Sequence, residues 1–190
     1  SGSCINVTKS FLLSEEENLE KIRWWLPQFR AGYGGIGSQH PKVMYVAETL
    51  SPNNTHNLPF EAGPSGYYLS ELMDEAQIPP GNIWLTNWRK KAGEHDNAIL
   101  LEQEIDHLNP RSIILLGAVA KKAIPVIAGR GIPYFSLEHP SSIVRFRPSA
   151  KTQYLQIWRK TYDEAIGETL SKPDPSENFE SELIRSISEI

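Results

Sequence analysis

Residues 98–128, AILLEQEIDHLNPRSIILLGAVAKKAIPVIA, contain the pattern that decides the fold. The apolar run Ser112–Leu116 is short and ends at a glycine, as is typical of a buried strand. On both sides of this run, over residues 98–108 and 118–128, apolar residues recur at helical spacing, and Asn109-Pro110 ends the first of these helices. Helix, strand and helix in this order indicate a parallel sheet with helices packed on its faces.

The same alternation continues in both directions along the chain. Further strands are expected at residues 42–47, 83–86 and 134–137. Further helices are expected from Ser14 toward Pro27, from Ser65 to the prolines at 79–80, and from about Ser149 to Leu170. The sequence therefore predicts an α/β fold with three layers, α/β/α, around a central four-stranded parallel sheet. Residues 1–172 are expected to form this single domain, and residues 173–190 an acidic C-terminal tail.

The glycine-rich run Gly32–Gly37 fits the letters of the phosphate-binding pattern GxGxxG. A functional run of that kind leaves a strand and opens a helix, so that phosphate meets the helix N-terminus. This run instead follows an expected helix and precedes an expected strand. We therefore expect a linker here rather than a dinucleotide site.

Composition excludes several classes of protein. A single cysteine, Cys4, allows no internal disulfide and no cysteine-based zinc or iron–sulfur site, and the five histidines have no metal-binding spacing. We therefore expect no metal and no other cofactor. No apolar run approaches the ~20 residues of a membrane span. An intracellular protein without a membrane partner is expected, in the cytoplasm or nucleoid, or in a host cytoplasm if the gene is phage-encoded.

The net charge of −4 hides an uneven distribution along the chain. Residues 81–160 carry 12 Lys and Arg against 6 Asp and Glu, whereas residues 161–190 carry 2 against 8. A basic stretch of this kind is what a phosphate-facing surface needs, because neutralising phosphates releases counterions. A solvated basic face with no ligand would have the same composition.

Functional residues are expected in the loops at the carboxyl ends of the strands, where ligands bind in parallel α/β sheets. Four short motifs occur there in one order. They are Pro59-Phe60 with Gly63, Ser65-Gly66 and Leu69; the strand 83–87 ending in Asn87; LNPRSIILLGAVA at 108–120; and His139-Pro140-Ser141 followed by Arg145. Together they resemble the uracil-DNA glycosylase superfamily. The iron–sulfur branch is the most similar in pattern, although its cluster cysteines are missing here.

The resemblance implies a role for each of four residues. Phe60 would stack on a pyrimidine flipped out of DNA, and Asn87 would read its edge with one donor and one acceptor. His139 would stabilise the negative charge on the departing base. Glu48 would position the attacking water, with Asn53 and His56 as alternatives.

Further residues near these motifs are expected to contact DNA. Polar and basic side chains suited to phosphate are Ser65, Arg89, Lys90, Ser141, Ser142 and Arg145. Ile143 is expected to insert into the stack that the flipped base leaves, although core packing would equally account for an isoleucine. Ordinary surface positions would equally account for the polar residues.

The expected activity is that of a monomeric DNA glycosylase on uracil or a 5-substituted pyrimidine in single- or double-stranded DNA. Two departures from the family pattern leave alternatives open. The Pro-Gly that usually follows the first strand is absent after Glu48, and no bulky side chain that would exclude a 5-methyl group is evident. The same pocket would then suit a phage-type transferase that modifies the pyrimidine 5-substituent. A catalytically inactive relative that binds DNA or a protein is the third possibility.

Overall fold

The computed structural model of the chain describes residues 35–49, 64–90 and 98–170. The helix expected from Ser14 and the acidic tail lie outside these residues. The elements in chain order are β1 (Ile36–Gly37), β2 (Val43–Thr49), α3 (Pro64–Glu75), η1 (Pro80–Asn82), β3 (Ile83–Arg89), α4 (Ala98–Leu108), β4 (Ser112–Leu116), η2 (Val119–Ala123), α5 (Ile124–Ala128), β5 (Tyr134–Leu137), α6 (Pro140–Phe146), η3 (Pro148–Ala150) and α7 (Lys151–Leu170).

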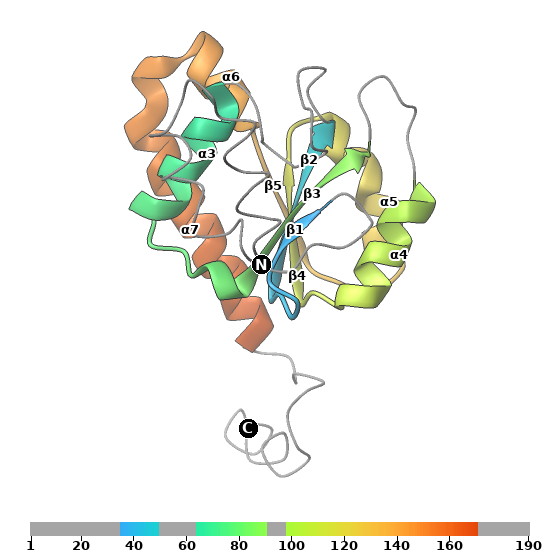
Figure 1. Ribbon diagram of the computed structural model, residues 1–190. Coiled ribbons are helices and arrows are strands. Elements are labelled where there is room, and N and C mark those ends of the chain that lie inside the picture. The colour runs from blue at the N-terminus through green and yellow to red at the C-terminus, as the bar shows by residue number, and fades with distance from the viewer. Residues whose placement is uncertain (1–34, 50–63, 91–97, 171–190) are drawn as a thin grey trace, which may run out of the picture.

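The predicted α/β fold is confirmed. The strands form one sheet in the order β1-β3-β2-β4-β5, and the four predicted strands run parallel to one another. Figure 1 shows α3, α6 and α7 on one face of this sheet and α4 and α5 on the other. The carboxyl ends of β2, β3, β4 and β5 therefore meet at one edge, where the loops expected to carry function begin.

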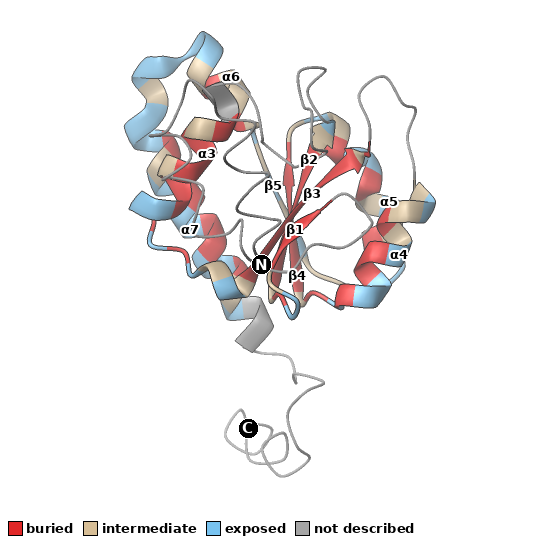
Figure 2. Cartoon of the chain, in the orientation of Figure 1, coloured by how far each residue is buried: buried red, intermediate tan, exposed pale blue. Residues whose placement is uncertain are grey.

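Alternation along β2 explains the two cores. Val43, Tyr45 and Ala47 pack into a cluster with α3 and α7, whereas Met44 and Val46 pack into a second cluster with α4 and α5. Successive side chains of a strand point to opposite faces, so a strand covered on both faces is apolar throughout. Figure 2 shows β2, β3 and β4 buried along nearly their whole length, whereas β5 is only partly buried.

The strand β1 corrects the expectation of a linker at Gly32–Gly37, of which residues 35–37 are described. Ile36 and Gly37 pair antiparallel with β3, opposite Leu85 and Trp84, and add a fifth strand to the sheet. Glycine permits this close approach. A Cβ on Gly37, whose φ is +149°, would lie 2.4 Å from the Ile83 carbonyl oxygen, and one on Gly35 would lie 2.3 Å from Trp84 Nε1.

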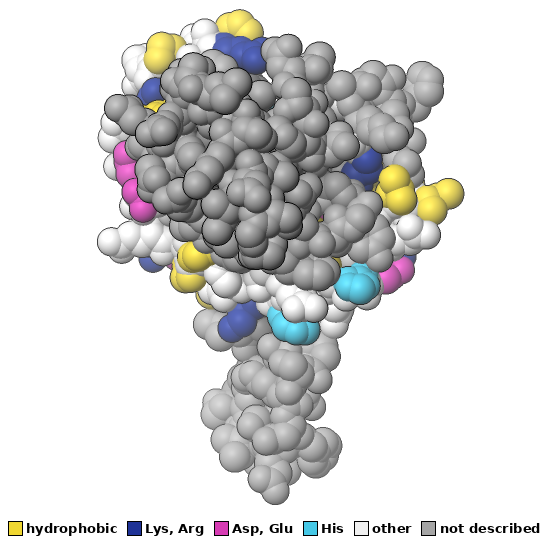
Figure 3. Space-filling model, viewed as in Figure 1, with side chains coloured by type: hydrophobic (Ala, Val, Ile, Leu, Met, Phe, Trp, Pro, Cys, Tyr) yellow, Lys and Arg dark blue, Asp and Glu magenta, His cyan; other side chains and the backbone are white. Residues whose placement is uncertain are grey.

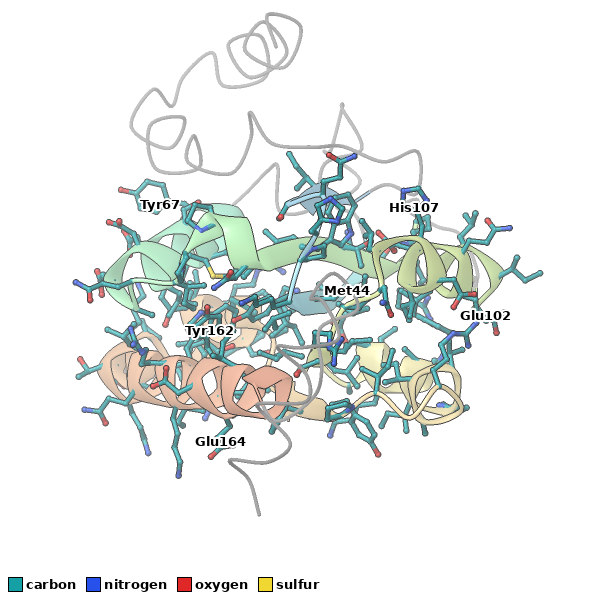
Figure 4. All side chains as sticks on the ribbon, turned by 90° about the horizontal axis from the view of Figure 1, so that it is seen from below. Met44, Tyr67, Glu102, His107, Tyr162 and Glu164 are labelled. Carbon is teal, nitrogen blue, oxygen red and sulfur yellow. The ribbon has the colours of Figure 1, made fainter. Side chains whose placement is uncertain are left out.

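The helix expected over residues 118–128 is divided into η2 and α5, with Pro125 in the first turn of α5. Proline lacks the backbone N–H that a helix interior requires but is tolerated in a first turn. The last helix is α7, which η3 precedes. In Figure 4 Tyr162 points from α7 into the helix and sheet layers, whereas Glu164 points away from them. None of the helices in the described ranges is both long and apolar enough to cross a membrane.

Candidate functional site

His139 lies two residues beyond β5 and caps the N-terminus of α6. The backbone N–H of Ser141 donates to His139 Nδ1 at 3.0 Å, and Pro140 occupies the first turn. This segment was expected to be a loop, and it is a helix because proline suits the first helical position and the imidazole accepts the capping hydrogen bond. With Nδ1 as an acceptor, the neutral ring carries its proton on Nε2.

Burial is the main influence on the charge of His139. It lowers the pKa of the imidazole, while the Glu48 carboxylate raises that pKa and the Arg145 guanidinium lowers it. The net direction is downward from the ordinary value of 6.5. His139 is therefore neutral at pH 7, in the form that its capping hydrogen bond requires. Glu48 and Arg145 therefore both lie close enough to the imidazole to act on its charge.

Glu48 stands at the end of β2, and its carboxylate reaches the turn after β4. Oε2 of Glu48 accepts from the backbone N–H of Val119 at 2.8 Å. A Cβ on Gly117, whose φ is +96°, would lie 2.7 Å from the Glu48 carboxyl carbon, so this turn requires glycine. The N–H of Gly117 in turn donates to the Leu137 carbonyl at 2.9 Å. Backbone and carboxylate thus connect the end of β2 to the segment that carries His139.

Asn87 lies near the carboxyl end of β3, in register with Ala47 of β2. Its side chain is 3% exposed. Alternation along β3 puts Asn87 on the same face as Leu85, the face that α3 and α7 cover. The strands β3 and β5 are separated by β2 and β4, so the two strands lie roughly 14 Å apart in the sheet. Asn87 on β3 and His139 after β5 therefore lie at two different positions along the same carboxyl edge.

Two of the expected DNA contacts are wrong. Lys90 is 6% exposed, and its ammonium pairs with Glu104 at 2.5 Å and donates to Thr86 Oγ1 at 2.6 Å. Glu104 also accepts from Trp84 Nε1 at 2.7 Å and from Thr86 Oγ1 at 3.0 Å. Burial lowers the pKa of Lys90, and the Glu104 carboxylate opposes that change. This lysine therefore ties β3 to α4 and is not available to phosphate.

Ile143 is the second correction. It was expected as an exposed residue that inserts into DNA, but it is 2% exposed and packs in the core cluster with α3 and α7. It lies on the inner face of α6, three residues before Phe146, which is 78% exposed. The helix α6, which the sequence did not predict, places Ile143 in the core, and Phe146 is its exposed last residue.

The remaining expected site residues differ in how far the structure describes them. Arg145 is exposed, and Arg89, Ser141 and Ser142 are half-buried at the same edge of the sheet. Phe60 and the side chain of Ser65 lie outside the described part of the chain. Among the described residues there is no group of three or more His, Cys, Asp and Glu side chains that would hold a metal ion.

Phe146 and Lys121 were missed by the sequence reasoning. Figure 3 shows hydrophobic and basic side chains next to one another at the top of the molecule, in the region of α6 and η3. Arg145, Phe146 and Arg147 are consecutive and exposed there, and Lys121 is exposed on η2 after β4. The available signal in the sequence was that Phe146 lies between Arg145 and Arg147. Arginine is almost never fully buried unless it is paired, so a segment that contains two arginines is expected to be exposed.

Comparison with protein-family models identifies a family over the region that contains these residues. A family model described as the uracil DNA glycosylase superfamily matches residues 35–161, which is more than half of the 190-residue chain. The matched region runs from β1 into α7 and includes Glu48, Asn87 and His139. A search of the curated proteins finds no match.

Proposed function

The chain belongs to the uracil DNA glycosylase superfamily, and from this premise we propose that it removes uracil or a 5-substituted pyrimidine from DNA. The base would be flipped out of the stack, because its glycosidic bond is not accessible inside a duplex. Cleavage of the bond between C1′ and N1 leaves the electron pair on the base. Water forms the new bond to C1′, and the proton that it loses ends on the released base.

The capped state of His139 is the observation that carries this proposal. A neutral imidazole with its proton on Nε2 is a hydrogen-bond donor that suits the negative charge on the O2 atom of the leaving base. The Ser141 N–H holds the other nitrogen at 3.0 Å, so the donor is oriented before substrate arrives. Preorganised donors of this kind typically contribute about 10²–10³ in rate.

Glu48 and Asn87 complete the proposed reaction. The Glu48 carboxylate would position water for attack at C1′, and the Val119 N–H at 2.8 Å keeps its Oε2 in a fixed place. The Asn87 carboxamide would donate to O4 and accept from N3–H of uracil, a pairing that cytosine mismatches. Phe60 would stack on the base from the loop that follows β2.

DNA binding is proposed at the carboxyl edge of the sheet. Arg145, Arg89 and the hydroxyl groups of Ser141 and Ser142 would contact phosphates next to the flipped nucleotide. Phe146 takes the inserting role that had been expected of Ile143, because its ring is 78% exposed between two arginines. The monomeric state and the intracellular location stay predictions.

The test is a product analysis on defined oligonucleotides that carry uracil, 5-hydroxymethyluracil or thymine. Mass spectrometry of the reaction should find free base and an abasic site in at least one of them. Absence of base release from every substrate would refute the proposal. An intact strand with a heavier base would identify the transferase alternative, and binding without any product would identify the inactive alternative.

A further inference from the structure

Glu138 connects β5 to His139, and side chains from other elements contact its carbonyl oxygen and its carboxylate. The backbone carbonyl oxygen of Glu138 accepts a hydrogen bond from the Tyr154 hydroxyl on α7. The carboxylate of Glu138 pairs with the Arg147 guanidinium at the end of α6. The peptide group that precedes His139 is therefore fixed from the helix layer.

Tyr154 is suited to hold that peptide group. The residue is 4% exposed and packs against Trp158 at a ring-centroid distance of 5.9 Å and against Tyr68 at 6.1 Å. Burial raises the pKa of its phenol above the ordinary value of 10.0, so the hydroxyl keeps its proton throughout the neutral range. The Tyr154 hydroxyl is therefore a hydrogen-bond donor in a fixed position.

The orientation of the 138–139 peptide group determines how His139 caps α6. His139 has φ −68° and ψ 137°, the extended conformation of an N-cap residue, and this conformation brings Nδ1 to the Ser141 N–H. Rotation of that peptide group would move the imidazole away from the N–H. The ring would then adopt either tautomer, and only one of them carries a donor on Nε2.

We propose that Tyr154 is a positioning residue for His139, which acts through the hydrogen bond of its hydroxyl to the Glu138 carbonyl. Its effect on turnover rests on the proposed function, whereas its effect on the imidazole does not. The hydroxyl would therefore keep the proton of His139 on Nε2 and keep the ring in the position from which Nε2–H stabilises the leaving base.

The experiment compares two substitutions on the same helix. Tyr154→Phe removes only the hydroxyl group that contacts Glu138. Tyr162→Phe is the matched control, because the Tyr162 hydroxyl accepts from Asn82 Nδ2 at 3.1 Å instead of donating to Glu138. Thermal unfolding of both variants reports whether each has lost only an ordinary hydrogen bond.

The first readout is the ¹⁵N chemical shift of both ring nitrogens of His139, measured above its pKa. The wild-type protein and Tyr162→Phe should give a protonated Nε2 and an unprotonated Nδ1. Tyr154→Phe should give averaged shifts that indicate both tautomers. Identical shifts in all three proteins would overturn the proposal whether or not the chain is a glycosylase.

The second readout is single-turnover base release. Tyr154→Phe should lower the maximal single-turnover rate constant about tenfold, which corresponds to the loss of one buried hydrogen bond, while the enzyme concentration that gives half of this rate stays nearly unchanged. Tyr162→Phe should keep the wild-type rate. Equal losses in both variants would show a merely structural role. If Tyr154→Phe does not fold, the hydroxyl proton of Tyr154 in the wild-type protein decides: slow exchange with solvent supports the hydrogen bond to Glu138, and fast exchange overturns it.

Discussion

Gly117 approaches Glu48 so closely that a Cβ on Gly117 would lie 2.7 Å from both the carboxyl carbon and Oε2 of Glu48. The contact is made while the Val119 N–H donates to the same carboxylate oxygen at 2.8 Å. The turn after β4 therefore fixes the position of the Glu48 carboxylate. Glycine is required at 117 because the carboxylate leaves no space for a Cβ and because its φ is +96°.

Replacing Gly117 should consequently disturb Glu48 more than it disturbs the fold. Gly117→Ala is expected to lower the free energy of unfolding by about 1–3 kcal/mol, because the alanine must hold a strained φ. The rate of base release should also fall in the fraction of the protein that stays folded, because the alanine displaces the Glu48 carboxylate. Gly167→Ala is the control: a Cβ there meets nothing within 4 Å, and alanine should stabilise α7 by about 0.5–1 kcal/mol. Unchanged base release in Gly117→Ala would contradict the proposed role of Glu48.

His139 should make stability depend on pH in a defined window. Burial lowers its pKa in the folded state, so the unfolded chain binds more protons below the ordinary value of 6.5. The stability that the neutral ring provides is therefore present above pH 6.5 and is lost as the pH falls through 6.5 toward the folded pKa. His139→Gln should remove this slope from urea unfolding measured across that window. A slope of the opposite sign would mean that the folded pKa is raised.

The charges near His139 should shift its titration in opposite directions. Glu48→Gln removes the group that raises the pKa of His139, so the NMR midpoint of His139 should fall. Arg145→Gln removes a group that lowers that pKa, so the midpoint should rise. Shifts in the same direction for both variants would show that these two charges do not act on the ring directly.

Lys90 should behave as a core residue and not as a DNA contact. Lys90→Met leaves Glu104 buried without its cation and is expected to cost about 3–5 kcal/mol of stability. The salt dependence of DNA binding should be unchanged in the folded variant. Arg145→Gln should instead reduce the slope of log K against log salt by about 1. Filter binding or fluorescence anisotropy at several salt concentrations measures these slopes. A reduced slope in Lys90→Met would mean that Lys90 contacts a phosphate after all.

Phe146 should contribute to DNA binding without contributing to stability. Phe146→Ala is expected to weaken binding by about 1–3 kcal/mol, because the stacking of a base on the ring is lost. The melting temperature should hardly change, since the residue is 78% exposed. Tyr134→Ala is the comparison: it removes a 41% exposed aromatic at the start of β5, at the opposite edge of the sheet. Equal losses of affinity in the two variants would argue against a specific contact at Phe146.

The strands could be predicted from the sequence because local composition determines them. Runs such as residues 113–116 are apolar throughout, as is expected of a short strand that helices cover on both faces. The edge of the sheet where Glu48, Asn87 and His139 lie follows from the parallel order alone. β1 could not be predicted in this way, because glycine has no strand propensity of its own. Gly35 and Gly37 lie in or next to this strand because only glycine allows the backbone to come so close to β3.

The errors at the site have two physical origins, a contact between residues distant in sequence and a local helix cap. Lys90 is polar and follows a strand end, and only Glu104 on α4 explains its burial. Ile143 lies in a segment that was expected to be a loop, and in the helix α6 it packs into the core, whereas Phe146, the last residue of α6, is exposed. The helix begins because His139 serves as the cap, a role that the residue type alone does not indicate.

The most direct measurement of the central claim is base release by the wild-type protein and by His139→Gln under single-turnover conditions. The account predicts free pyrimidine and an abasic site from at least one uracil-type oligonucleotide. It further predicts a rate that falls by about 10²–10³ in the variant while DNA binding is retained. A variant that releases base as fast as the wild-type protein would contradict the account.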